Sequence, residues 1–207
     1  LNALKLGRFV DAENYFQQSL AADDLLGERA GKVSAMCYIA ELAAIRGDYE
    51  RSDQIAWEVY QLAETFGITF YEICSYNNLG YVAILRGEIE QAKQYYTIGL
   101  KLSLEISAEF LHLLMKRWLG YIAYHQSDYE ASYRYFEGSL KVARSIQRPT
   151  DSAIALTGLA KVACAQGEWQ TAQKYLQQSF DILQKSTTMP DLLDAFVTLC
   201  RLWIERE

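Results

Sequence analysis

The sequence predicts an all-α protein, a right-handed α-α superhelix of five tandem helix-turn-helix repeats that are each 40 residues long. Three observations predict this fold class. Glycines recur along the chain at intervals of 40 residues or a multiple of 40. Apolar residues follow helical spacing on both sides of these glycines. Only two prolines and twelve glycines occur in 207 residues, which favours helices over sheets and turns.

Several columns of residues keep one register through five successive copies. The turn column contains four glycines and one serine, at Gly7, Gly47, Gly87, Ser127 and Gly167. Five residues later every copy has a small residue, at Ala12, Ser52, Ala92, Ser132 and Ala172. We therefore expect one repeat domain over residues 1–207, with units 1–40, 41–80, 81–120, 121–160 and 161–200 and the start of a further unit at 201–207.

Each unit is expected to contain two helices, the first ending at the turn column and the second beginning directly after it. Glycine suits the left-handed backbone that ends many helices. The acidic residue that follows the turn column suits the positive end of the next helix, at Asp48, Glu88, Asp128 and Glu168. A second break is expected about twenty residues later. It falls at Gly27, Gly67, Ser107, Arg148 with Pro149, and residues 188–190.

Stacking is expected to hold the helices together, because neither helix of a unit can bury its apolar face alone. The product is a solenoid of about eleven helices without separate domains or linkers. Small residues such as Ala83 and Ala123 are expected where two helices approach closely. The tyrosines eight residues after the turn column are expected in the core, at Tyr15, Tyr95, Tyr135 and Tyr175.

Composition and charge exclude several classes of protein. With 51% apolar and 22% charged residues, the chain has too much apolar material for a disordered acidic tail. A net charge of −6 argues against nucleic acid or an anionic membrane as a direct partner. No apolar run reaches the roughly 18 residues that span a bilayer. The four cysteines lie far apart without a CxxC pair, so we expect reduced thiols in a cytoplasmic protein.

Motifs of catalysis and of cofactor binding are lacking in the sequence. Residues 27–33 look superficially like a phosphate-binding loop, but the spacing is one residue short and Val33 stands where Ser or Thr is required. No HExxH, GxSxG or GxGxxG motif occurs. The two histidines, His112 and His125, are thirteen residues apart and do not share one metal-binding edge. We expect no enzyme, no cofactor and no metal.

The repeat resembles the tetratricopeptide repeat (TPR). Its later pattern elements are matched by Asn78, Leu79, Gly80, Gly87, Ala92, Tyr96 and Gly99, and Phe16 and Phe136 share the aromatic position of Tyr96. The chain departs from the pattern at a tyrosine position that is alanine here (Ala43, Ala83, Ala123 and Ala163) and at a tryptophan position occupied by Lys116. The unit is also 40 rather than 34 residues long.

Longer units of this kind are similar to the superhelical sensor arrays of bacterial LuxR-type and STAND regulators, including the activator of the maltose system. They are also similar to the arrays of kinesin light chains and of adaptors for heterotrimeric G proteins. The resemblance covers the whole chain and implies a binding module for a protein, a peptide or a small effector.

The same resemblance implies that the first helix of each unit lines a concave groove. At the positions that correspond to the groove-facing positions of the family, the residue type differs from one repeat to the next. Positions that serve only packing are expected to be uniform. The candidate binding residues are Glu41, Asn77, Tyr81, Arg117, Tyr121, Tyr124, His125 and Lys161. Arg and Tyr are enriched among binding anchors. The alternative is that these side chains are merely solvated walls of the groove. No pair of lysines matches the carboxylate clamp of chaperone-binding members.

Two functions remain open. The first is the sensor or scaffold module of a larger bacterial signal-transduction or transcription regulator, and the second is a free-standing adaptor. The chain begins at Leu1 without a methionine and ends at Glu207 in a segment that still carries Leu199, Leu202 and Trp203. We therefore expect a fragment of a larger protein, with exposed ends that associate end to end.

Overall fold

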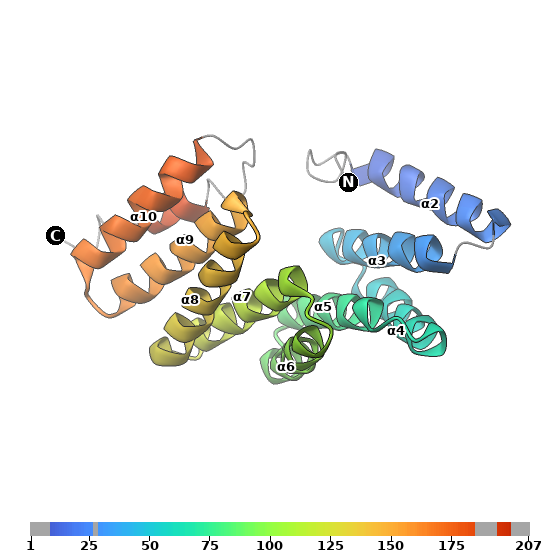
Figure 1. The fold of residues 1–207 in the computed structure, drawn as a ribbon, viewed down its shortest axis with the longest axis horizontal. Helices are drawn as coiled ribbons and strands as arrows, with labels where there is room; N and C mark the ends of the chain where they lie inside the picture. The colour runs from blue at the N-terminus through green and yellow to red at the C-terminus, as the bar shows by residue number, and fades with distance from the viewer. Residues whose placement is uncertain (1–8, 27–28, 185–193, 200–207) are drawn as a thin grey trace. The chain divides into compact units, whose positions relative to one another are not determined.

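The computed structural model describes residues 9–26, 29–184 and 194–199. All regular structure in these ranges is α-helical, as expected, and Figure 1 shows the helices following one another along the chain. The helices are α2 (Phe9–Leu26), α3 (Arg29–Ile45), α4 (Tyr49–Phe66), α5 (Thr69–Arg86), α6 (Ile89–Glu105), α7 (Glu109–His125), α8 (Tyr129–Ser145), α9 (Pro149–Ala165) and α10 (Trp169–Leu183). Residues 194–199 are helical as well. The fold is an all-α solenoid of TPR-like repeats.

The turns between helices lie where the repeat predicts them. At the turn column the backbone is left-handed, with φ of 83° at Gly47, 80° at Gly87, 59° at Ser127 and 75° at Gly167. The second breaks are left-handed at Gly67, Ser107 and Gln147, with Pro149 beginning α9. The expected turns at Gly7, Gly27 and 188–190 lie outside the described residues.

Acidic residues cap the second helices in two different ways. The Asp48 carboxylate accepts a hydrogen bond from the Arg51 amide at 3.2 Å, and Asp128 accepts one from the Ala131 amide at 3.0 Å. Glu88 and Glu168 hold the same N-cap position without a side-chain hydrogen bond. Aspartate is a preferred N-cap residue, whereas glutamate contributes its charge to the positive helix end.

The serine in the turn column yields a prediction about stability. Replacing Ser127 by glycine is expected to raise the free energy of unfolding by about 0.5–1 kcal/mol, because a Cβ atom is unfavourable in a left-handed backbone. The reverse change, Gly87→Ser, should lower it by a similar amount, since an added Cβ there has open space around it and only the backbone strain counts. Urea denaturation measures both. Effects of the same sign in the two variants would contradict this explanation.

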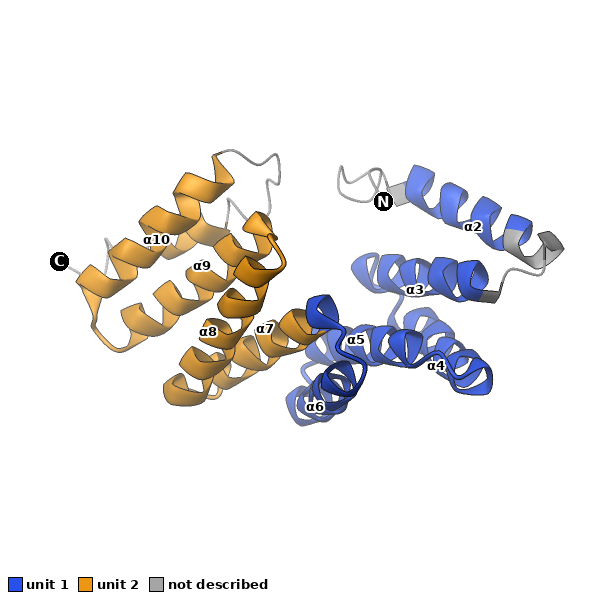
Figure 2. Ribbon diagram, viewed as in Figure 1, with its two compact units in different colours: residues 1–111 blue, residues 112–207 orange. Residues whose placement is uncertain are grey.

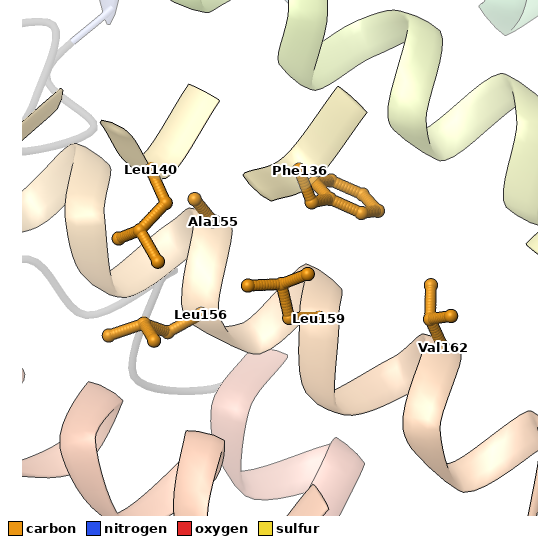
Figure 3. Packing of buried hydrophobic residues seen from close by; sticks show 6 residues of the cluster. All are labelled: Phe136, Leu140, Ala155, Leu156, Leu159 and Val162. Atoms are coloured by element: carbon orange, nitrogen blue, oxygen red, sulfur yellow. The ribbon is translucent and has the colours of Figure 1, made fainter. Parts of the chain in front are cut away.

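The chain divides into two compact units, residues 1–111 and 112–207 (Figure 2). In the first unit each helix from α2 to α5 packs against the next one, and α3 also packs against α5. In the second unit α9 packs against both α8 and α10. Figure 3 shows the core between α8 and α9, where Phe136 and Leu140 face Ala155, Leu156, Leu159 and Val162.

Small residues in the repeat columns bring neighbouring helices into hydrogen-bonding distance. The buried Ser52 hydroxyl donates to the Ala40 carbonyl at 2.8 Å, and the buried Ser132 hydroxyl donates to the Gly120 carbonyl at 2.9 Å. Both bonds tie a second helix to the first helix of its own pair. Ala83 and Ala123 are buried as expected, with 3% and 6% of their surface exposed.

The tyrosine column is less uniform than the sequence predicts. Tyr95, Tyr135 and Tyr175 are half-buried, but Tyr15 is 64% exposed. Tyr15 belongs to α2, which packs chiefly against α3 within the described part of the chain, so the core position expected for it is wrong.

None of the described helices is both long enough and apolar enough to cross a lipid bilayer. Self-association through the chain end was expected from Leu199, Leu202 and Trp203. Leu202 and Trp203 lie outside the described residues.

Candidate binding surface on the first helices

The eight candidate residues all lie on first helices, which are the helices that end at the turn column (α3, α5, α7 and α9). The unit 1 set consists of Glu41 on α3 with Asn77 and Tyr81 on α5. The unit 2 set consists of Arg117, Tyr121, Tyr124 and His125 on α7 with Lys161 on α9. His125 is exposed and the other seven are half-buried. The two sets belong to different compact units. That all eight residues line one groove therefore stays a prediction.

Arg117 of the unit 2 set already has a carboxylate partner. Its guanidinium donates to Asp151 Oδ1 on α9 at 3.2 Å, and Arg148 donates to the other oxygen, Oδ2, at 2.5 Å. Only 7% of Asp151 is exposed. Arg117, a candidate binding residue from the sequence, therefore links α7 to α9.

Lys161 is paired in a similar way. Its ammonium group donates to both carboxylate oxygens of Asp194, at 2.7 and 2.9 Å, and lies 5.4 Å from the centre of the Tyr121 ring. Tyr121 itself meets Phe136 edge to face, with ring centres 5.0 Å apart. Both cations of the unit 2 set are thus neutralised by the chain itself.

The remaining members of the unit 2 set add aromatic surface. Tyr124 lies 5.6 Å from the His125 ring, at nearly a right angle, and 5.9 Å from the Tyr129 ring. Tyr124 also packs against the core between α8 and α9. This set therefore offers rings and balanced charges to a partner.

The unit 1 set has the opposite character. No described residue forms an ion pair or a hydrogen bond with the Glu41 carboxylate, and burial raises the pKa of this group. The side-chain oxygen of Asn77, Oδ1, is buried, and no donor among the described residues bonds to it. Burial raises the pKa of Tyr81, and the nearby Glu41 and Tyr49 raise it further. Two acceptors of this set, the Glu41 carboxylate and Asn77 Oδ1, receive no hydrogen bond from the described residues.

Two cysteines that look unrelated in the sequence come together next to the unit 1 set. A hydrogen bond with the Cys74 thiol and burial hold the pKa of Cys37 well above its ordinary value. The Asn78 side-chain amide donates to the Cys37 carbonyl at 2.9 Å and links α3 to α5. The thiols are free, as expected. The two cysteines are 37 residues apart, which is close to the repeat length of 40. That spacing is the signal in the sequence that could have predicted their proximity on neighbouring first helices.

The described residues offer little support for metal binding or phosphate binding. No three His, Cys, Asp or Glu side chains gather there as a metal site requires. In the segment that looks like a phosphate loop, residues from Arg29 onward already belong to α3. A helix does not wrap a phosphate as such a loop does.

Comparisons with known proteins agree with this architecture. The family model described as "MalT-like TPR region" matches residues 2–207. No curated protein matches the sequence.

Several solved structures share the fold at low sequence identity. BtubC (BKLC) from P. vanneervenii has a TM-score of 0.78 at 17% identity, over 94% of this chain and 83% of that one. A STAND protein with a tetratricopeptide repeat sensor, PH0952 from Pyrococcus horikoshii, has a TM-score of 0.68 at 14% identity, over 84% of this chain and 27% of that one. The apo form of RapI has a TM-score of 0.69 at 13% identity, over 84% of this chain and 71% of that one.

Proposed function

Because the chain belongs to the family of MalT-like TPR regions, we propose that it is a non-catalytic binding module. Its first helices receive a protein, a peptide or a small effector. In this proposal the module is the sensor or scaffold part of a bacterial signal-transduction or transcription regulator.

The observation that carries the proposal is the contrast between two kinds of column. The small-residue column is uniform and buried, with at most 1% exposed at Ala12, Ser52, Ala92, Ser132 and Ala172. A second column, on the first helices, has a different type of side chain in each 40-residue repeat: Cys37, Asn77, Arg117 and Thr157. Packing alone favours uniform columns in a repeat protein. Thr157 is buried, whereas Cys37, Asn77 and Arg117 are half-buried. Half-buried side chains of varied chemistry are typical of a surface that recognises a partner.

The likeness to the STAND protein supports the regulatory role. The chain matches 27% of that protein, whose structure is described as having a tetratricopeptide repeat sensor. Such an array serves there as one part of a larger signal-transduction ATPase. A similar role here implies that the module passes ligand binding on to an attached effector domain.

A free-standing adaptor is the second candidate. The likeness to BtubC favours it, because the matched array makes up 83% of that chain. The product of the complete gene distinguishes the two functions. An ATPase core or DNA-binding helices joined to this array would support the regulator, and an array on its own would support the adaptor.

The binding surface can be tested by capture of partners from a lysate of the source organism. Tyr81→Ala, Tyr124→Ala and His125→Ala alter first helices, while Lys93→Ala and Lys174→Ala alter exposed positions on second helices. We expect at least one first-helix variant to lose the partner and both second-helix variants to keep it. Circular dichroism melts show which variants remain folded. Loss of the partner in the lysine variants alone would place the binding surface on the second helices.

A further inference from the structure

Glu41 differs from the other carboxylates of the chain that have limited exposure. Five of those pair with a cation: Glu13 with Arg46 and Arg51, Asp53 with Arg86, Asp151 with Arg117 and Arg148, Glu137 with Lys141, and Asp194 with Lys161. Glu41 is half-buried and receives no cation and no hydrogen bond from the described residues. A charge in such a place is costly unless a partner compensates it.

The position of Glu41 along its helix adds to this cost. It lies four residues before the end of α3 at Ile45, where the helix dipole is negative and repels a carboxylate. Glu72 also lacks a cation among the described residues, but it lies in the first turn of α5, where the positive helix end compensates it. Glu41 therefore has neither a side-chain partner nor a favourable dipole.

Two tyrosine rings lie near Glu41, and a further acceptor lies one turn from one of them. Glu41 lies three residues after Tyr38 on one face of α3, and the hydrogen bond from Asn78 to the Cys37 carbonyl joins α5 to α3 about one turn before Tyr81 and Glu41. The Glu41 carboxylate also adds to the effect of burial in raising the pKa of both phenols. Tyr38 is held in place by stacking on Phe16, with ring centres 5.0 Å apart. One helical turn before Tyr81, Asn77 carries its buried, unpaired amide oxygen. The groups in this region accept hydrogen bonds and present ring faces, which is the complement of a cation.

We propose that Glu41, with Tyr38, Tyr81 and Asn77, binds the guanidinium group of an arginine side chain presented by a peptide or protein partner. A guanidinium group has five donors in one plane, so it can pair with a carboxylate through two hydrogen bonds and also stack on a tyrosine ring. The compact ammonium group of lysine lacks that plane. This inference rests on the proposed binding function and names the ligand of its unit 1 set.

The unit 2 set contains a cation in the position that we propose for the partner's arginine. There Lys161 sits over Tyr121 while it pairs with Asp194, so one cation contacts a carboxylate and a tyrosine ring together. In the first compact unit the Glu41 carboxylate lies near a tyrosine ring, and the described residues supply no cation to this carboxylate. The partner's arginine completes an arrangement that unit 2 completes with its own lysine.

Titration with short peptides tests the proposal. The probes are acetyl-Gly-Arg-Gly-amide, the same peptide with lysine, and the same peptide with citrulline, which keeps the shape of arginine without its charge. Amide chemical shifts of the labelled protein report binding. We expect the arginine peptide to bind with a Kd of about 1 mM, which suits a single anchoring side chain. Shifts should concentrate on α3 and α5, and the citrulline and lysine peptides should bind more weakly.

Matched variants connect the binding to Glu41. Glu41→Gln should weaken the arginine peptide about tenfold, and Glu58→Gln, which removes an exposed carboxylate from α4 in the same unit, should leave the affinity unchanged. Glu41→Gln should not lower the melting temperature at pH 7, because it removes an uncompensated charge, so lost binding will not reflect unfolding.

Three results would overturn the inference: no binding of the arginine peptide, equal binding of the lysine or citrulline peptide, or unchanged affinity in Glu41→Gln. If the arginine peptide fails while first-helix variants still lose the captured partner, the guanidinium site is wrong and the binding function stands. If first-helix variants keep the partner and the arginine peptide binds as expected, the broader proposal fails.

Discussion

Replacing Phe136 by alanine is expected to lower the free energy of unfolding by about 3–5 kcal/mol. The ring is fully buried and belongs to the same core cluster as Leu156 and Leu159, which Figure 3 shows. It also fills the space beside two glycines of neighbouring first helices. A Cβ atom added at Gly120 on α7 would lie 3.1 Å from the ring, and one added at Gly158 on α9 would lie 2.5 Å from it. Truncation therefore leaves a cavity between three helices.

A double-mutant cycle can show that the glycines make room for this ring. Gly158→Ala should cost about 1–3 kcal/mol, because the ring is buried and cannot move away from the new methyl group. In the Phe136→Ala background the same change should cost little, since the clash is gone.

Gly138→Ala is the matched control in α8. Its Cβ atom would meet the end of the Lys116 side chain at 2.8 Å, which is flexible and can shift. The alanine should therefore be neutral, or stabilising by up to about 1 kcal/mol through helix propensity. Urea denaturation monitored by circular dichroism gives all these values. Additive effects of Phe136→Ala and Gly158→Ala would show that the glycine is not there to accommodate the ring.

Replacing Asp151 by asparagine is expected to lower the free energy of unfolding by about 3 kcal/mol. Asp151 accepts hydrogen bonds from Arg117 and Arg148, and 7% of it is exposed. Asparagine has nearly the same shape but no charge. It would leave the Arg117 guanidinium, whose side chain is 16% exposed, without the anion that compensates its burial.

The matched control is Glu130→Gln in the same unit. Glu130 pairs with Arg134 one turn later on α8, and the two side chains are 83% and 67% exposed. Its loss should cost less than about 0.5 kcal/mol, because solvent screens such a pair. Chemical denaturation at pH 7 compares the two variants. Similar losses in both would mean that Asp151 is no more important for folding than a surface carboxylate.

The Asp151 pair changes how binding experiments on Arg117 should be interpreted. Arg117→Ala removes a contact between α7 and α9, so it is expected to lower stability as well as any affinity. Tyr121→Ala has the same drawback, because Tyr121 packs on Phe136. The folded fraction of each variant has to be measured before lost binding is assigned to a lost contact.

The helices and their turns could be predicted from the sequence because they depend on residues that are close along the chain. Gly47 and Gly87 adopt the left-handed backbone that ends a helix, and each is followed by the N-cap residue of the next helix. The repeat then extends each local prediction to the other units. Even Ser127, which departs from glycine, adopts the left-handed backbone of its column.

The candidate site was predicted less completely, because its chemistry depends on contacts between helices. Arg117 and Lys161 were identified as groove residues, but their partners Asp151 and Asp194 lie 34 and 33 residues further on. Burial is limited in the same way. The repeat predicts a core position for Tyr15, but a residue is buried only where another helix covers it, and Tyr15 is exposed.

By itself, the sequence determined the fold class, the length of the repeat and the positions of the turns, since these follow from helical periodicity and from the backbone preferences of single residues. Which polar side chains the chain itself neutralises depends on how the helices pack, and periodicity along the sequence does not show it. The tertiary structure pairs Arg117 with Asp151 and leaves Glu41 without a cation among the described residues. The physical reason is that the cost of a charge depends on burial and on neighbouring groups, which periodicity does not specify.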